Sequence, residues 1–277
     1  MLIWMRLAAP DVALTEGAIG TGLNGMLLLG AASSLRSRAM TPSDHSPERV
    51  RRIVVGVLCS AVVFGLIVAV ASLPSPAPSL AGPVRDALPA TQLENPVTGV
   101  LMAFRGLDTL LEKVVLFLAL VGVWCLAPDR AWGTEPSVPL APHFGPNQSG
   151  ALVFLARVLP PFWIALGIYL AWNGSIEPGG AFPGGAVLAA MVLLVLVAGL
   201  RKAPSISRRW VRLIVVAGPV AFIVIAFAGY PLAGAFLAYP ERWAKAVIVL
   251  VEAMMLLSIA ATLSLLLLGP PGQESPT

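Results

Sequence analysis

Charged side chains are scarce in this sequence: Asp, Glu, Lys and Arg make up 12% of its 277 residues, whereas apolar residues make up 57%. Soluble domains carry about 25% charged residues, so this chain has too little charge to coat a water-exposed surface. The scarcity places it among membrane proteins. It also argues against nucleic acid as a partner, because a nucleic-acid-binding face needs clustered Lys, Arg and aromatic residues.

Cysteine and histidine are equally rare. The two cysteines, Cys59 and Cys125, lie inside apolar runs, and the two histidines, His45 and His143, lie in polar segments. This distribution offers neither a disulfide framework nor the spacing of metal ligands. Phosphate-binding loops, zinc-protease motifs and nucleophile elbows are absent as well. We therefore expect no enzyme, no catalytic residue, no metal site and no bound cofactor.

Long apolar runs are abundant instead. A helix needs roughly 20 apolar residues to cross a bilayer, and the sequence offers seven candidates of about that length. They predict an all-α, polytopic transmembrane bundle of about seven spans in contact with the lipid bilayer. The candidates are residues 12–35, 53–73, 104–127, 151–173, 182–200, 211–229 and 243–268.

The basic residues between these runs predict the orientation. Segments 36–52 and 201–212 carry five Lys or Arg residues each, whereas segment 74–96 carries one and segment 174–181 carries none. Because Lys and Arg concentrate in cytoplasmic loops, we expect the N-terminus outside and the C-terminus inside. The proline-rich segment 74–96 is expected to be an extended external link.

Residues 128–148 are also rich in proline and predict a cytoplasmic linker between two modules. The first module, residues 1–127, would contain three spans, and the second, residues 149–277, would contain four.

Carboxylates inside the predicted spans are the first candidate functional residues, because a charge at this depth is costly and usually marks an ion or proton pathway. Glu16 lies near the start of the first span and Glu252 lies alone near the middle of the last. The alternative for Glu16 is a carboxylate that favours the positive end of a helix. The alternative for Glu252 is a protonated carboxyl that only holds two helices together.

The third span carries a charged face. Arg105, Asp108 and Glu112 are spaced three and four residues apart, which places them on one side of a helix, and Lys113 lies beside them. A chain of carboxylates and bases can pass protons. The alternative is a set of ion pairs that only fixes helix packing.

A glycine-rich segment separates the fourth and fifth spans. Residues 178–185 contain four glycines and two prolines, a composition that a regular helix does not tolerate. Such backbone can line a cavity inside a membrane protein, or it can be an ordinary tight turn followed by small-residue helix packing. The candidate site-shaping residues are Glu177, Pro178, Gly179, Gly180, Phe182, Gly184 and Gly185.

This segment resembles the glycine-rich signature of the B subunit of Mrp-type sodium/proton antiporters, which typically reads Pro-Gly-Gly-Gly-Phe-Gln-Gly-Gly. Here Ala181 and Pro183 depart from that pattern, and Pro183 removes an amide donor. Four spans after about residue 148, the last with a carboxylate, also fit that subunit. Glu252 resembles the glutamate of its last helix.

The first half resembles the C-terminal region of the antiporter's A subunit, which also occurs as small subunits of membrane-bound hydrogenases. The similarity lies in Ala9 to Gly20 and in Phe104 to Glu112, a segment that usually reads Phe-Arg-Gly-Phe-Asp-Thr-x-Gly-Glu. Leu107 and Leu111 replace the usual Phe and Gly. Two helices normally precede the first segment, and here we expect either that a neighbouring subunit supplies them or that the start is truncated.

The resemblance implies a subunit of a multisubunit cation/proton antiporter in the bacterial inner membrane, with other antiporter or complex-I-like subunits as partners and only Na+ and H+ as transported species. It implies ion or proton translocation through Glu16, Asp108, Glu112 and Glu252. Two alternatives stay open: the ion-translocating arm of a membrane-bound hydrogenase or complex-I-like redox complex, and a structural scaffold.

Overall fold

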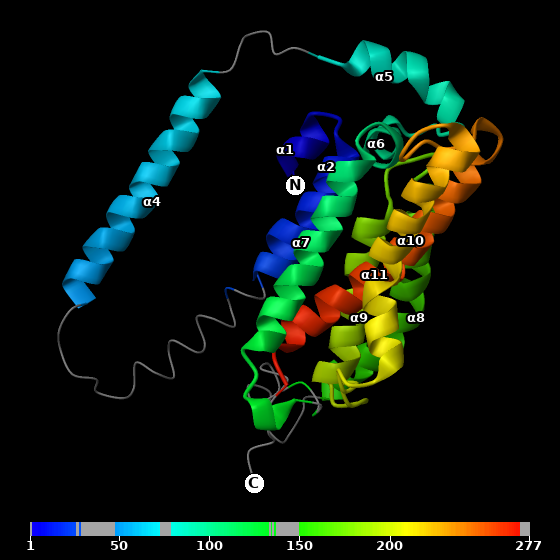
Figure 1. Ribbon diagram of the computed structural model, residues 1–277. Coiled ribbons are helices and arrows are strands. Elements are labelled where there is room, and N and C mark those ends of the chain that lie inside the picture. The colour runs from blue at the N-terminus through cyan, green and yellow to red at the C-terminus, as the bar shows by residue number, and fades with distance from the viewer. Residues whose placement is uncertain are drawn as a thin grey trace. The chain divides into compact units, whose positions relative to one another are not determined.

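The computed structural model describes residues 2–25, 28, 48–72, 79–132, 134, 136 and 150–271. Every regular element within these ranges is a helix (Figure 1), which confirms the predicted all-α class. The α-helices are α1 (Leu2–Arg6), α2 (Pro10–Glu16), α4 (Glu48–Ala71), α5 (Ala81–Ala87), α6 (Pro96–Gly99), α7 (Gly106–Cys125), α8 (Gly150–Asn173), α9 (Ala181–Val197), α10 (Arg209–Ala233) and α11 (Ala244–Leu268). Shorter elements are the π-helices η1 (Gly17–Leu23) and η3 (Val100–Phe104) and the 3-10 helices η2 (Leu88–Thr91), η4 (Asp129–Ala131) and η6 (Glu241–Trp243).

The contacts divide the chain into two units, one formed by residues 1–30 with 84–277 and the other by residues 31–83. The second unit is represented mainly by α4, whose apolar side chains from Ile53 to Ala71 are exposed. A helix this apolar with nothing buried on it requires lipid or another protein surface around it.

Four of the described helices are long and apolar enough to cross a membrane, by length and composition: Ile53–Ala71, Gly150–Asn173, Arg209–Ala233 and Glu241–Leu268. Helix α9 is apolar but shorter, with 17 residues. Helix α7 has 20 residues but carries three charged ones, Asp108, Glu112 and Lys113. The chain is thus a multi-pass membrane protein, while the count of seven spans and the orientation stay predictions.

The expected first span begins as α2 and continues into η1, and most of its remainder lies outside the described residues. The predicted linker 128–148 also lies mostly outside them, apart from η4.

The prediction that segment 74–96 is extended was wrong for its second half, which contains α5 and η2. Pro83 is the third residue of α5 and Pro89 is the second residue of η2. Proline is tolerated in the first turn of a helix, where its missing N–H has no partner to lose. A high proline content therefore did not exclude short helices.

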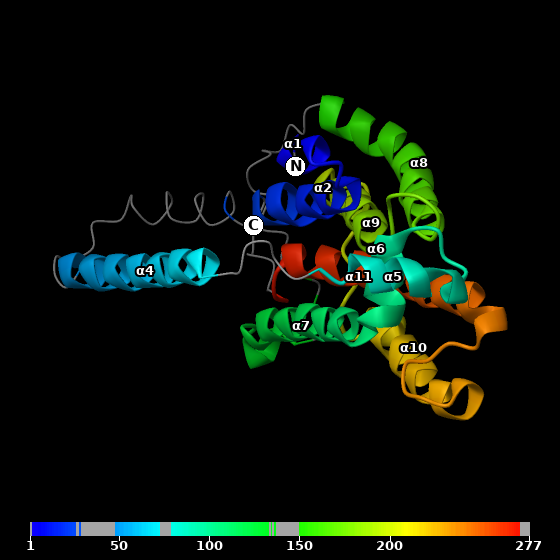
Figure 2. The same cartoon turned by 90° about the horizontal axis from the view of Figure 1, so that it is seen from above.

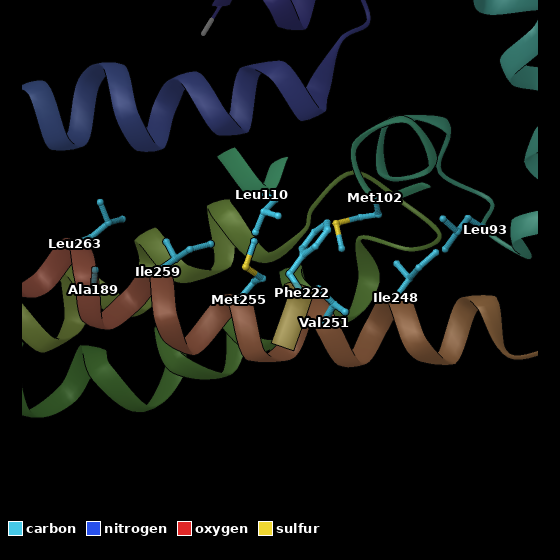
Figure 3. Packing of buried hydrophobic residues seen from close by; sticks show 10 residues of the cluster. All are labelled: Leu93, Met102, Leu110, Ala189, Phe222, Ile248, Val251, Met255, Ile259 and Leu263. Carbon is cyan, nitrogen blue, oxygen red and sulfur yellow. The ribbon is translucent and has the colours of Figure 1, made fainter. Parts of the chain in front are cut away.

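Helix α11 forms the core of the larger unit. It packs against α7, α8, α9 and α10 (Figures 1 and 2), and its apolar residues are not confined to one stripe, as expected for a helix with neighbours on several sides. Figure 3 shows Met255 of α11 meeting Leu110 of α7, with Phe222 of α10 and Met102 beside them. This cluster holds α7 on the face of α11 that also carries Glu252.

Small residues bring α9 unusually close to its neighbours. A Cβ on Gly184 would lie 2.5 Å from the carbonyl oxygen of Gly167 in α8, and a Cβ on Gly185 would lie 2.8 Å from Ile259 in α11. Backbone contact of this kind is typical of helix pairs in membranes. It fixes the start of α9 between α8 and α11, directly beside Glu252.

Candidate functional site

Four ionisable side chains from distant parts of the chain, Asp11, Glu112, Lys113 and Glu252, line one cavity of about 80 Å³. About 10–15 Å³ of such volume is enough for one water molecule, so the cavity can hold several. Its other lining residues are Thr15, Val97, Thr98, Leu101, Met102, Thr109, Gly179, Gly180, Ala181, Phe182, Pro183 and Met255. The structure therefore brings together Glu112, Glu252 and part of the glycine-rich segment.

Glu252 is buried, with 5% of its surface exposed. The backbone N–H of Ala181, the first residue of α9, donates a hydrogen bond to its carboxylate. The four leading N–H groups of a helix have no partner within the helix and carry partial positive charge. The Oε2 atom of Glu252 has no hydrogen-bond partner among the described residues. One carboxylate oxygen is therefore held in place, while the other is buried without a partner beside the cavity that Glu252 lines.

Lys113 and Glu112 also line the cavity. Lys113 is 6% exposed, and its Nζ lies 3.5 Å from Oε1 of Glu112 and 4.1 Å from the centre of the Phe182 ring. A cation over an aromatic face is stabilised by the ring's quadrupole, and more so where water is excluded. Phe182 directly follows Ala181, so one turn of α9 contacts both the buried cation and the buried carboxylate.

Asp11 ties the N-terminal helix to the glycine-rich turn. Its Oδ1 accepts hydrogen bonds from the backbone N–H of Gly179 at 3.1 Å and from the Asn95 side-chain amide at 3.3 Å. The same amide group donates to the carbonyl oxygen of Glu177 at 3.0 Å, while the Asn95 Oδ1 caps α6 at Val97 N. Thus the backbone of one turn presents an N–H to Asp11 at Gly179 and an N–H to Glu252 at Ala181.

Asn95 and Thr98 strengthen the same junction. The Thr98 hydroxyl donates to the carbonyl oxygen of Gly174 at 2.6 Å, and the N–H groups of Glu94 and Asn95 share the carbonyl oxygen of Ser175. Asn95 and Thr98 are 4% and 5% exposed. Because these polar groups are buried and paired, the turn has little freedom to move away from α6.

The remaining predicted site residues lie away from the cavity lining. Asp108 forms an exposed ion pair with Arg105, with 2.6 Å between Oδ2 and Nε. Glu16 is exposed on α2, and Glu177 is exposed at the start of the turn. Of the turn residues, Pro178 lies outside the lining, and Gly184 and Gly185 serve helix packing instead.

Both departures from the glycine-rich pattern are compatible with the turn. Ala181 contributes its N–H to Glu252, which requires no particular side chain. Pro183 is the third residue of α9, where an amide has no intrahelical acceptor. The donor that Pro183 removes is therefore not one that the helix needs.

Asp11, Lys113 and Asn95 were not among the predicted site residues. Asp11 lies on the same helix as Glu16, five residues before it, and Lys113 directly follows Glu112. The only signal for each was therefore an ionisable residue near a predicted one. Asn95 stands before Pro96, a pairing typical of a capped helix start. No local pattern could show that these residues meet residues 174–182.

The arrangement can accept a small cation or a proton. Carboxylate oxygens are the preferred ligands of hard cations, and a carboxyl that alternates between protonated and ionised forms can pass a proton. Within the described residues, no group of three or more His, Cys, Asp or Glu side chains could hold a metal ion.

Two parts of the chain, one near each end, match known protein families. Residues 151–269 match the family described as a domain related to the MnhB subunit of Na+/H+ antiporter, and residues 1–37 match MbhD, a family of MBH subunits. The chain is 30% identical over 125 residues to the protein named antiporter subunit mnhA2 in Staphylococcus haemolyticus. That match covers 45% of this chain, and the chain spans only 15% of that relative's length.

Two solved structures share the fold. A chain of the Mrp complex from Dietzia sp. DQ12-45-1b is similar over 100% of this chain and 31% of its own, with a TM-score of 0.66 and 24% identity. A chain of the membrane-bound sulfane sulfur reductase, an archaeal respiratory membrane complex, is similar over 78% of this chain and 96% of its own, with a TM-score of 0.58 and 24% identity. By the two family matches, residues 151–269 form an MnhB-related domain and residues 1–37 an MbhD region.

Proposed function

We propose that this chain is a subunit of a multisubunit Na+/H+ antiporter of the Mrp type, in the bacterial cytoplasmic membrane, and that its cavity is part of the ion or proton path. It would work with other antiporter subunits, with the N-terminus outside and the C-terminus inside, and without a bound cofactor. The MnhB-related domain and the mnhA2 relative support the assignment to an antiporter.

The unpartnered Oε2 atom of the buried Glu252 carries the proposal. A buried polar atom without a partner costs free energy, so a structure that keeps one usually has a use for it. Here Glu252 lines a cavity that Glu112 and Lys113 also line. Glu252 would bind the proton or cation, and the Ala181 N–H would hold the carboxylate in position.

Glu112 would connect the cavity to the surface of the chain, because half of its side chain is exposed while Lys113 beside it is buried. Asp108 and Glu16, both exposed on this chain, would take part only where a neighbouring subunit covers them. Ion pathways inside membranes run between such ionisable groups when these face protein or water rather than lipid.

Exchange in everted membrane vesicles that contain the whole complex tests the proposal. We expect Glu252→Gln to abolish Na+-dependent proton exchange and Glu112→Gln to reduce it strongly, with unchanged co-purification of the other subunits. Glu241→Gln is the matched control, because Glu241 is exposed and outside the cavity lining. Normal exchange in both cavity variants would remove the ion path from this chain and leave a scaffold.

A second candidate is the ion-translocating arm of a redox-driven complex. It is supported by the structural match to a chain of the sulfane sulfur reductase, because the match extends over 96% of that chain. The same vesicles separate the two. An antiporter exchanges Na+ for protons across an imposed gradient without an electron donor, whereas a redox arm moves ions only while electrons flow.

A further inference from the structure

A second, larger cavity lies where α9 and α11 end, at the opposite end of both helices from the Ala181–Glu252 contact. Its volume of about 680 Å³ lies within the range of roughly 300–1,000 Å³ that is usual for ligand pockets. Most of its wall is apolar and comes from α8, α9, α10 and α11, including Val192, Ile214, Ala260 and Leu268.

One end of this cavity is basic. Arg201, Lys202 and Arg208 all line it, and all three are exposed. Residues 198–212 contain no Asp or Glu, and none of the three cations forms a salt bridge within the described part of the chain. Uncompensated cations beside an apolar groove are complementary to a ligand with an anionic head and an apolar tail.

The basic end of the cavity also carries a residue typical of the depth of lipid headgroups. Trp210, which is 50% exposed, lines the cavity next to Arg208, and Trp is enriched at the level of lipid headgroups. From the basic end the apolar wall reaches from Leu268 back to Ala260, eight residues or about 12 Å along α11 at ~1.5 Å per residue. This depth is appropriate for an acyl chain rather than for a small soluble anion.

We propose that this cavity is a binding site for one anionic phospholipid. The phosphate lies among Arg201, Lys202 and Arg208, and an acyl chain lies in the apolar groove between α9 and α10, with α11 at its base. Basic pockets between transmembrane helices at the cytoplasmic surface recognise anionic headgroups in this way. The bound lipid covers Val192, which is 45% exposed and lines the groove.

The test is lipid titration followed by native mass spectrometry. The full chain is delipidated together with its co-purifying subunits, and phosphatidylglycerol or phosphatidylcholine is added. The wild type should retain phosphatidylglycerol preferentially. The triple variant Arg201→Gln/Lys202→Gln/Arg208→Gln should lose that preference by about fivefold for each charge removed, which is the change expected from about 1 kcal/mol for each basic residue.

A charge-matched triple variant provides the control. Arg130, Arg157 and Arg209 are exposed and do not line the cavity, so Arg130→Gln/Arg157→Gln/Arg209→Gln should keep the preference. Val192→Phe narrows the groove and retains all charges. It should weaken retention of phosphatidylglycerol with long acyl chains and leave the binding of inorganic phosphate unchanged.

Three results would overturn the proposal. Equal losses in the two triple variants would indicate unspecific charge attraction. Inorganic phosphate that displaces phosphatidylglycerol completely would indicate a site for the free anion. A photoreactive residue at position 192 that cross-links to another subunit, and not to lipid, would show that protein occupies the groove.

Discussion

Asp11 accepts a hydrogen bond from the backbone N–H of Gly179 across 3.1 Å, although 168 positions separate the two residues in the sequence. Asp11 belongs to the part of the chain that matches MbhD, and Gly179 belongs to the MnhB-related domain. The MbhD-like region and the MnhB-related domain are thus joined at the turn whose next residue, Ala181, donates a hydrogen bond to Glu252.

Asp11→Ala should weaken this junction. It leaves the partly buried Gly179 N–H and one proton of the Asn95 amide without their acceptor, and about 1–3 kcal/mol is the upper range for such a group, reached where it is fully buried. We expect a lower melting temperature of the purified chain with its co-purifying subunits and slower cation-dependent proton exchange. Asp11→Asn, which keeps an acceptor oxygen, should lie between this variant and the wild type. Asp86→Ala, at an exposed position of α5, is the control and should match the wild type; a loss as large as that of Asp11→Ala would contradict the prediction.

Gly180→Ala should disturb Glu252 through the backbone. Gly180 has φ of 110° and ψ of 175°, a conformation that is essentially restricted to glycine. A side chain there costs about 1–3 kcal/mol unless the turn changes shape, and a changed turn would move the Ala181 N–H from Glu252. We expect reduced thermal stability and reduced exchange together. Gly82→Ala is the matched control, because Gly82 lies in α5 with open space around it; equal losses in both variants would count against this explanation.

The sequence alone predicted the helical class and the position of Glu252 in the last long helix, because each depends on local composition. The expectation that the composition of residues 178–185 excludes a regular helix was wrong for residues 181–185, which begin α9, because proline is tolerated in the first turn of a helix and the glycines allow close packing. A charge in a long apolar run and a cluster of glycines are visible without any contact information. The cavity itself could not be predicted, since it depends on Asp11, Glu112 and Glu252 meeting across long separations. The role of Pro83 and Pro89 was misjudged because proline content says nothing of where a helix begins.

Asp108 and Glu112, four residues apart on α7, should differ in their effect on transport. The Asp108 carboxylate is 55% exposed and paired with Arg105, whereas Glu112 lines the cavity. An exposed ion pair contributes only about 0.2–1 kcal/mol, so Asp108→Asn should change stability little and preserve most of the exchange rate. Glu112→Gln should lower the rate strongly at the same expression level. A larger loss for Asp108→Asn would move the ion path to the outer face of α7.

Tyr239→Phe should reduce stability by an amount that does not depend on pH near neutrality. The Tyr239 hydroxyl donates to the carbonyl oxygen of Met102 at 2.9 Å, and burial, with a smaller contribution from the charge of Glu252, raises the pKa of Tyr239 to about 12. Because the pKa of Tyr239 is raised in the folded chain, the hydroxyl's contribution to the free energy of unfolding is fully present below pH values of about 10, the ordinary pKa of tyrosine. That contribution is lost only as the pH rises toward about 12. We expect a cost of about 0.5–1.5 kcal/mol, measured as a melting-temperature difference at several pH values below about 10. A difference that grows between neutral and mildly alkaline pH would contradict this assignment.

Lys113→Gln separates a transport role of the buried cation from a packing role. Its Nζ contacts both Glu112 and the ring of Phe182, so the substitution removes an ion pair and a cation–π contact at once. Phe182→Leu removes only the ring, at a cost of about 0.5–2 kcal/mol for the lost contact, and retains the charge in the cavity. If Lys113 is part of the ion path, Lys113→Gln should abolish exchange and change its pH profile, while Phe182→Leu should reduce stability and keep the profile of the wild type. Equal effects of the two variants on both stability and exchange would mean that Lys113 serves packing alone, and the path would then rest on Glu112 and Glu252.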